Sequence, residues 1–130
     1  MSKNRNSKPK LLITEDDFES QKLLQLILKK DFEIDICDSE QSFYRRLNEK
    51  KYDAVLMDVS LKGGVNGLEI IKDLRKKSNY RNLPVVGLSA HVFPQDRMKA
   101  KEAGLDAYLT KPINNSLLIR TLINLIERNT

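Results

Sequence analysis

Short apolar runs alternate with amphipathic segments along the whole chain. Apolar runs lie at residues 11–13, 54–57, 84–88 and 107–109, and residues 32–37 alternate, with Phe32, Ile34 and Ile36 on one side. Between them, apolar residues recur every three or four positions, as they do on one face of a helix. Helices are expected at residues 17–30, 39–50, 68–74, 94–103 and 116–128. The pattern therefore predicts a strand followed by a helix, repeated five times.

The ends of several helices are marked by residues with known capping preferences. Ser39 is expected to cap the second helix, Pro94 fits the first turn of the fourth, and Gly104 is placed to end it. In the first helix, one face is expected to be buried; it carries Leu23, Leu24, Ile27 and Leu28.

Continuously apolar strands indicate a parallel sheet that is covered by helices on both faces. Crossover connections in such a sheet are right-handed, which leaves few possible topologies. The fold class predicted from the pattern is α/β, a doubly wound (βα)5 sandwich. The 130 residues suffice for one domain with its own core.

Charge is unevenly distributed along the chain. The net charge is +5, but the acid-free first ten residues contribute +4 of it through Lys3, Arg5, Lys8 and Lys10. Residues 1–9 are therefore expected to be a disordered basic tail, and residues 10–130 the domain. A domain with so little net charge argues against direct binding to DNA.

Two further features bear on the compartment. Cys37 is the only cysteine, which excludes an internal disulfide and a cysteine-based zinc cluster. No apolar run approaches the ~20 residues that span a bilayer, and the first ten residues do not resemble a secretory signal. A cytoplasmic protein without membrane contact is the resulting expectation.

Polar residues follow the four apolar runs, two of them directly and two after one threonine. They are Glu15-Asp16, Asp58, Ser89-Ala90 and Lys111-Pro112. The carboxyl ends of parallel strands meet at one edge of the sheet, where ligands bind. Three carboxylates, a hydroxyl and a lysine at this edge indicate a site for a divalent cation and a phosphoryl group.

Each of these residues has a chemical role that suits such a site. The Asp58 carboxylate can attack phosphorus and form an acyl phosphate. Glu15 and Asp16 would repel Asp58 unless a divalent cation offset their charge, and Mg²⁺ prefers such oxygen ligands. An ordinary loop or N-cap role is the alternative for Asp58, and an N-cap role for Asp16 or Asp17.

Lys111 and Ser89 complement the carboxylates. The Lys111 ammonium can pair with Asp58 or with phosphoryl oxygens, and the peptide bond to Pro112 is a candidate for the cis form. The Ser89 hydroxyl and the backbone N–H of Ala90 can donate to the same phosphoryl oxygens. A solvated lysine and a loop serine are the alternatives.

Taken together, these segments resemble the receiver domain of two-component response regulators, over about residues 9–128. The matching segments are Leu11-Leu12-Ile13-Thr14-Glu15-Asp16, Leu56-Met57-Asp58-Val59, Gly87-Leu88-Ser89-Ala90 and the stretch from Ala103 through Lys111-Pro112 to Ile113. The resemblance implies a flavodoxin-like five-stranded parallel sheet in the order 2-1-3-4-5, a strand order for which a chemotaxis receiver protein is a known example. It also implies a response regulator, or CheY-like phosphoprotein, acting in a two-component system or phosphorelay.

The mechanism that the resemblance implies is transfer of a phosphoryl group to Asp58 from a histidine kinase or a histidine phosphotransfer protein. Asp16, Asp58 and the backbone carbonyl of Ser60 would bind Mg²⁺ or Mn²⁺, with Glu15 acting through water. Ser89, Ala90 and Lys111 would bind the phosphoryl group, and Ser89 and Tyr108 would switch the surface formed by the fourth helix, fifth strand and fifth helix. Ser60 and His91 would tune the lifetime of the phosphate, with a plain surface role as the alternative for His91. The protein would catalyse only its own phosphorylation and dephosphorylation and would not otherwise be an enzyme.

Two departures from the common family pattern are visible. The loop after Asp58 is one residue longer and lacks the usual Met-Pro, and Glu15 stands where an aspartate is commoner. The first is expected to change the loop contacts near the metal. The second is expected to change the outer-shell geometry of the metal without abolishing binding.

Other functions fit the sequence less well. A phosphatase of the haloacid dehalogenase type needs an aspartate where Ser60 stands, and the glycines at 63, 64 and 67 do not form a nucleotide-binding motif. A degenerate receiver that binds proteins without being phosphorylated remains the alternative. The sequence also leaves open whether the chain is a stand-alone regulator or a module of a hybrid kinase, what its output partner is, and whether phosphorylation drives formation of a homodimer.

Overall fold

Five parallel strands form the centre of the molecule, in the order β2-β1-β3-β4-β5. The computed structural model describes residues 7–59, 66–90 and 94–130. The strands are β1 (Lys10–Thr14), β2 (Glu33–Cys37), β3 (Ala54–Asp58), β4 (Val85–Ser89) and β5 (Ala107–Thr110). The helices are α1 (Phe18–Leu28), α2 (Glu40–Glu49), α3 (Gly67–Leu74), α4 (Pro94–Ala103) and α5 (Asn115–Arg128), with a short 3₁₀ helix, η2 (Ser78–Tyr80). The predicted fold class and strand order are confirmed.

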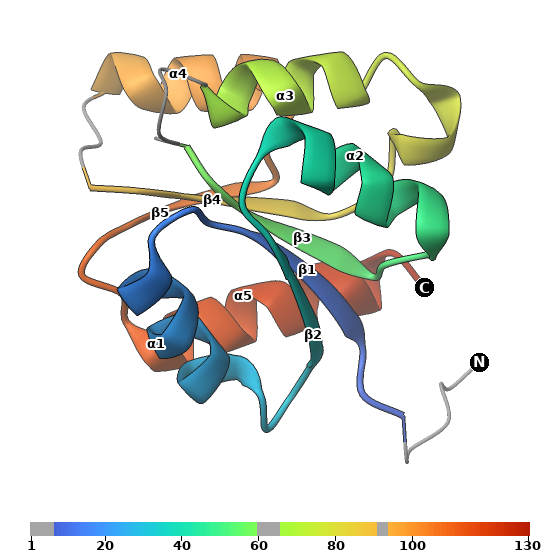
Figure 1. Cartoon of the computed structure of the whole chain (residues 1–130). Coiled ribbons are helices and arrows are strands. Elements are labelled where there is room, and N and C mark those ends of the chain that lie inside the picture. The colour runs from blue at the N-terminus through green and yellow to red at the C-terminus, as the bar shows by residue number, and fades with distance from the viewer. Residues whose placement is uncertain (1–6, 60–65, 91–93) are drawn as a thin grey trace.

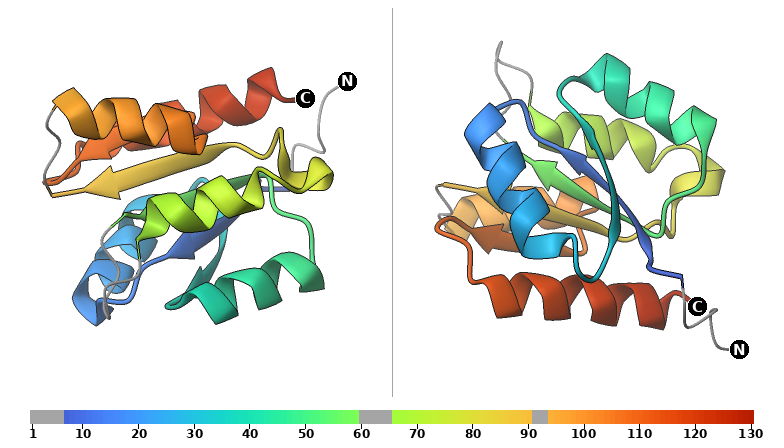
Figure 2. Two further views of the ribbon diagram at one scale, coloured as in Figure 1. Left: turned by 90° about the horizontal axis from the view of Figure 1, so that it is seen from above. Right: turned by 60° about the horizontal axis from the view of Figure 1, so that its bottom comes forward.

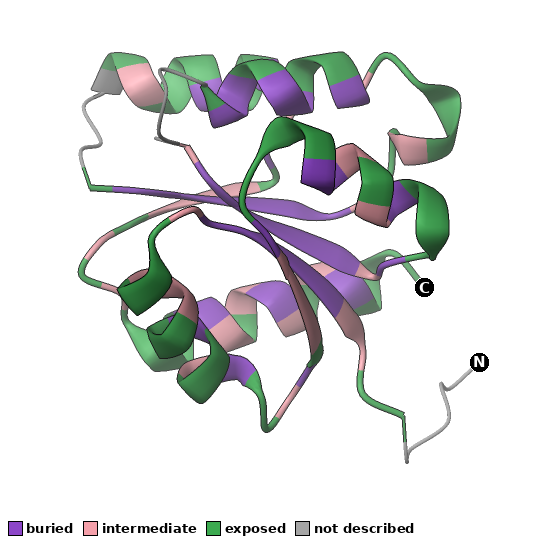
Figure 3. Cartoon of the chain, in the orientation of Figure 1, coloured by how far each residue is buried: buried purple, intermediate pink, exposed green. Residues whose placement is uncertain are grey.

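Helices cover both faces of this sheet (Figures 1 and 2). Helices α2, α3 and α4 lie on one face, and α1 and α5 lie on the other. Leu12 packs into the core on the α2–α4 face, whereas its neighbours Leu11 and Ile13 pack into the core on the α1–α5 face. Because side chains alternate along a strand, a strand that is covered twice must be apolar at successive positions. This is why β1, β3 and β4 appear almost uniformly buried in Figure 3.

The helices begin and end at residues that satisfy their exposed backbone groups. Asp17 and Ser39 accept hydrogen bonds from the N–H groups of Ser20 and Ser42, and so cap α1 and α2. Gly104, with φ of +105°, ends α4 in the left-handed conformation that glycine tolerates best. The Leu105 N–H donates to Ala100 O at 3.1 Å, the bond that closes a Schellman motif. The predicted caps at Ser39 and Gly104 are confirmed.

One prediction for the first helix is wrong. Leu23 is 53% exposed, whereas Leu24 and Leu28 are buried and Ile27 is half-buried. Leu24 and Leu28 lie one turn apart on the same line of the helix, and that line faces the sheet. Leu23 is rotated by about 100° from Leu24, which carries it to the outer side of α1.

The chain before β1 contacts the bottom edge of the sheet. Lys8 Nζ donates to Lys29 O at 3.0 Å, and Glu33 N donates to Pro9 O at 2.8 Å. The division into a tail over residues 1–9 and a domain over 10–130 stays a prediction. Among the described residues, no helix combines the length and the apolar character that crossing a membrane requires.

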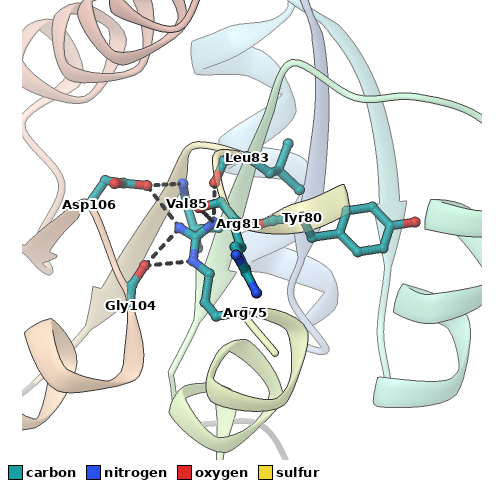
Figure 4. Close-up of polar contacts among 7 residues, drawn as sticks. All are labelled: Arg75, Tyr80, Arg81, Leu83, Val85, Gly104 and Asp106. Atoms are coloured by element: carbon teal, nitrogen blue, oxygen red, sulfur yellow. Dashed lines mark hydrogen bonds and ion pairs between the residues drawn. The ribbon is translucent and has the colours of Figure 1, made fainter. Parts of the chain in front are cut away.

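Arg75, the residue after α3, connects the segments that enter β4 and β5 (Figure 4). Its guanidinium donates to the carbonyl oxygens of Gly104, Tyr80 and Leu83 at 2.7 to 3.0 Å, and to Asp106 Oδ2 at 3.0 Å. Asp106 Oδ2 also accepts from the Val85 N–H at 2.8 Å. The five N–H donors of a guanidinium can serve several carbonyl groups at once, as a lysine ammonium cannot.

Replacing Arg75 with methionine should lower the free energy of unfolding by about 3 kcal/mol, because several partly buried carbonyl groups lose their donor. Arg75→Lys is the matched control, and should restore only part of the loss because one ammonium cannot reach all of these oxygens. Urea unfolding followed by circular dichroism measures both. Equal stability of the parent and the methionine variant would contradict this role.

Candidate functional site

The register of the strands brings the predicted polar residues to one edge of the sheet. Thr14 of β1 pairs with Met57, Asp58 with Leu88, and Ser89 with Thr110. Glu15, Asp58, Ser89 and Lys111 therefore all lie at or just beyond the carboxyl ends of their strands. This is the edge at which open α/β sheets bind ligands.

Three carboxylates gather at this edge. Oxygens of Glu15, Asp16 and Asp58 all lie within 4.8 Å of one another. Glu15 and Asp58 are only 1% and 6% exposed, and Asp16 is half-buried. Burying several like charges together is unfavourable unless a proton or a cation offsets them.

Glu15 shows this conflict most clearly. Its Oε2 accepts from the Asp17 N–H at 3.1 Å, but Oε1 is a buried oxygen without a hydrogen-bond donor among the described residues. Burial raises the pKa of Glu15 to about 7, helped by its hydrogen bond with Asp58. The Asp17 N–H and the charge of Lys111 act in the opposite direction and lower this pKa.

Lys111 supplies positive charge between two of these carboxylates. Its Nζ lies 3.5 Å from Glu15 Oε1 and 3.6 Å from Asp58 Oδ2. The backbone N–H of Lys111 donates to Ser89 O at 2.9 Å, which joins the ends of β4 and β5. The predicted cis peptide bond between Lys111 and Pro112 is confirmed.

The acidic cluster fits a divalent cation. Within the described part of the chain, Lys111 is the cation that lies between Glu15 and Asp58, and its one positive charge does not balance three ionised carboxylates. Hard oxygen donors are the ligands that Mg²⁺ prefers, and the buried Glu15 Oε1 still lacks a hydrogen-bond donor within the described segments.

The other predicted site residues divide into two groups. Ser89 is buried and Ala90 is exposed at the end of β4, and Tyr108 is half-buried in β5, where it packs against the core on the α2–α4 face. Ser60 and His91 lie outside the described residues. The predicted carbonyl ligand at Ser60, and the predicted effect of both residues on phosphate lifetime, therefore stay predictions.

Sequence reasoning noticed Gly67 only as a loop glycine, but it lies against the backbone of Asp58. A Cβ at this position would lie 2.6 Å from Asp58 O and 3.0 Å from the Val59 Cα. The Gly67 N–H donates to Val59 O at 3.0 Å and thereby fixes this approach. Helix α3 can begin this close to Asp58 only because its first residue, Gly67, has no side chain.

Gly67→Ala should therefore destabilise the chain by about 1–3 kcal/mol, because the added methyl group meets backbone atoms that cannot rotate away. Gly87→Ala provides a comparison, since its Cβ would approach the ends of the Leu105 and Tyr108 side chains, which can move. Thermal unfolding of both variants measures the difference. A larger loss in the Gly87 variant would show that the contact with Asp58 is not the dominant constraint.

Comparisons with known proteins agree with this geometry. Residues 11–123 match the family model described as the response regulator receiver domain. The chain is 31% identical over 120 residues to the phosphate regulon transcriptional regulatory protein PhoB of Escherichia coli, covering 92% of this chain and 52% of PhoB. It is 35% identical over 121 residues to hybrid signal transduction histidine kinase I of Dictyostelium discoideum, covering 87% of this chain and 7% of that protein.

A solved structure shows the same fold. It is the receiver domain of the sensor histidine kinase PA1611 of Pseudomonas aeruginosa, which has a magnesium ion coordinated in its active-site cleft. The TM-score is 0.83 at 26% identity, and the alignment covers 93% of this chain and 99% of that one. The chain spans about half the length of PhoB and a small part of the hybrid kinase. On the match over residues 11–123, the chain belongs to the response regulator receiver domain family of two-component signalling.

Proposed function

We propose that Asp58 accepts a phosphoryl group from a phosphohistidine of a histidine kinase or a histidine phosphotransfer protein. The observation that carries this proposal is the position of Asp58, a buried carboxylate at the end of β3 with Lys111 Nζ 3.6 Å from its Oδ2. Homology to both a response regulator and a hybrid histidine kinase supports this donor class.

In the transfer, a carboxylate oxygen of Asp58 attacks phosphorus and forms an acyl phosphate. The bond between phosphorus and the imidazole nitrogen breaks, and that nitrogen keeps the electron pair and takes up a proton from solvent. Such a transfer depends on positioning and on offsetting the charge of the phosphoryl oxygens. Lys111 contributes positive charge here, and the Ser89 hydroxyl and the Ala90 N–H donate hydrogen bonds to these oxygens.

The acidic cluster would hold Mg²⁺, or Mn²⁺ in its place. Asp16, Asp58 and the backbone carbonyl of Ser60 are the proposed direct ligands, and Glu15 the ligand through water. When bound, the cation supplies charge stabilisation for the phosphoryl oxygens. The donor set of this chain and the magnesium described for the PA1611 receiver support this assignment.

Phosphorylation is proposed to act on the surface formed by α4, β5 and α5. Ser89 would move toward the phosphoryl group, and Tyr108 would turn inward into the space beside it. Arg97 Nη1 of α4 donates to Tyr108 O at 3.4 Å, so the switch residue already contacts the helix that it would influence. A local change of charge can bias a two-state surface in this way.

The remaining proposals concern context. The chain would act in the cytoplasm, would catalyse only its own phosphorylation and dephosphorylation, and would not bind DNA directly. Phosphorylation-dependent pairing of two copies is the proposed consequence for oligomeric state. The cognate kinase and the output partner are not assigned.

Intact mass spectrometry after incubation with acetyl phosphate and Mg²⁺ tests the proposal. We expect the mass of one phosphoryl group to be gained, to be prevented by EDTA, and to be lost on treatment with hydroxylamine, which cleaves acyl phosphates. An unchanged mass with bound Mg²⁺ absent as well would contradict the proposal and favour a receiver that binds partners without phosphorylation.

A further inference from the structure

Strand β2 is an edge strand whose outer side faces solvent between two helices. Within the described part of the chain, it pairs only with β1. In Figure 1 it is the front strand, with α1 and α2 on either side of it, and Figure 3 shows it as mostly half-buried. An edge strand presents backbone N–H and C=O groups that can pair with a further strand.

The hydrogen bonds to β1 identify which backbone groups face outward. Glu33 N donates to Pro9 O, and Cys37 O accepts from Glu15 N, so residues 33 and 37 direct their backbone groups toward β1. These groups alternate sides along a strand, which places those of Ile34 and Ile36 on the outer side. A short added strand could pair with the backbone groups of these two residues.

Two hollows run along this outer side and join each other. One, of about 460 Å³, is lined by Leu26 and Lys29 of α1 together with Phe32 and Ile34. The other, of about 610 Å³, extends past Ile36 to α2. Both share Lys22 and Gln25, so they form one groove, which we call the β2 groove. Leu26 is 65% exposed in its wall, which leaves an apolar surface for a side chain to cover.

The β2 groove is predominantly basic. Four of its lining residues are cationic, namely Lys22, Lys29, Arg45 and Arg46, and only Asp38 and Glu49 are acidic. The two acidic residues of β2 do not give the groove a negative charge, because both pair with Lys50. Lys50 Nζ lies 2.8 Å from Asp35 Oδ2 and 3.7 Å from Glu33 Oε2. Charged side chains are a common protection of edge strands, and here they are engaged elsewhere.

We propose that the β2 groove binds an extended acidic peptide segment of a partner protein by strand addition to β2. Backbone bonds to Ile34 and Ile36 would align the segment, an apolar side chain would cover the exposed Leu26, and carboxylates would pair with Arg45 and Lys22. Charge complementarity selects this occupant. A second copy of the chain would bring two basic grooves together, which is unfavourable.

This interaction goes beyond the proposed phosphotransfer and does not require it. The groove nevertheless lies close to the acidic cluster, since the Cys37 carbonyl at the end of β2 accepts from the backbone N–H of Glu15 at 2.9 Å. A partner held there would be anchored beside the phosphorylation edge while leaving α4, β5 and α5 uncovered.

Fluorescence anisotropy with a labelled peptide, Ser-Glu-Val-Asp-Ile-Glu-Val-Asp-Ser, tests the proposal on the full chain without acetyl phosphate. We expect saturable binding that is weakened by about tenfold in Arg45→Glu and in Leu26→Glu, both of which alter exposed side chains. Leu23→Glu is the matched control, because Leu23 is also an exposed leucine of α1 but lines neither hollow, and this variant should bind as the parent does. Asp58→Asn should also bind normally, which separates this result from that of the phosphorylation assay.

Amide hydrogen exchange supplies the readout that is specific to strand addition. The Ile34 and Ile36 N–H groups should gain protection when the peptide is bound, and a peptide with proline at its central position should not protect them. Equal binding of a peptide with lysine in place of every acid would overturn the proposal. So would absent binding, binding without protection of these two amides, or concentration-dependent dimers of the chain that Leu26→Glu abolishes.

Discussion

Asp58→Asn should take up no phosphoryl group from acetyl phosphate. In the absence of metal, the variant should also be more stable against unfolding than the parent chain. The amide lacks the nucleophilic oxygen, so the acyl phosphate cannot form. It also removes one of three carboxylates that lie within 4.8 Å of one another at a buried edge. We expect the free energy of unfolding near pH 8 to rise by about 1–2 kcal/mol, since one of several mutually repelling buried carboxylates is removed.

The Lys111 contacts support this expectation. Lys111 Nζ lies within 3.6 Å of both Asp58 and Glu15, so it keeps one carboxylate partner in the variant. Asp73→Asn is a suitable control, because Asp73 lies on the surface of α3, where its Oδ1 is 3.5 Å from Nζ of the exposed Lys76. It should leave phosphorylation and stability unchanged. Phosphorylation of the Asp58 variant, detected by intact mass, would place the acceptor elsewhere, and a loss of stability would show that Asp58 contributes more attraction than repulsion.

The fold was predictable because its signals are local or periodic. Uniformly apolar strands such as 54–57 identify a sheet covered on both faces, and Ser39 and Gly104 mark helix ends by their own side-chain or backbone preferences. The site was equally accessible, since Glu15, Asp58, Ser89 and Lys111 follow strands directly and parallel strands end at one edge. Geometry that depends only on chain direction and strand order can be inferred from the order of residues.

Other features depend on contacts between distant segments and could not be predicted. Arg75 donates to carbonyl groups of two segments that are distant in the sequence, the chain after η2 and the end of α4. No local sequence pattern predicts that these segments lie close together. The approach of Gly67 to Asp58 likewise depends on where α3 docks. The exposure of Leu23 depends on how α1 is rotated against the sheet. Apolar residues occur on more than one side of this helix, so the sequence alone does not identify the side that is buried.

The pKa of Glu15 makes the metal-free protein sensitive to pH in an unusual direction. Most carboxylates stabilise a folded protein above their pKa, but the pKa of Glu15 is raised from 4.5 to about 7 by burial and by Asp58. The folded state therefore binds this proton more tightly than the unfolded state does. Its contribution to stability is fully present below the unfolded pKa of about 4.5 and is lost as the pH rises through about 7.

Glu15→Gln tests both the direction and the cause of this dependence. In EDTA, the parent chain should lose roughly 2–3 kcal/mol of unfolding free energy between about pH 5 and about pH 8 that the glutamine variant keeps. Urea unfolding at the two pH values measures the difference, and Asp73→Asn again serves as the surface control. Identical pH profiles of the parent and the glutamine variant would show that the buried Glu15 carries little of the charge conflict.

Mg²⁺ should reduce the difference in stability between the parent chain and the glutamine variant. In the parent chain it should bind only the folded protein, so saturating Mg²⁺ near pH 8 should restore the stability lost to the charged cluster. Glu15→Gln should bind Mg²⁺ about 10–100-fold more weakly, the range seen when an outer-shell ligand is lost, and should gain correspondingly less stability. Calorimetric titration at pH 8 measures the affinity directly. The advantage that the variant has without metal should therefore shrink by about 1.4–2.7 kcal/mol in saturating Mg²⁺, because the same buried carboxylate that destabilises the metal-free fold would also help to hold the cation.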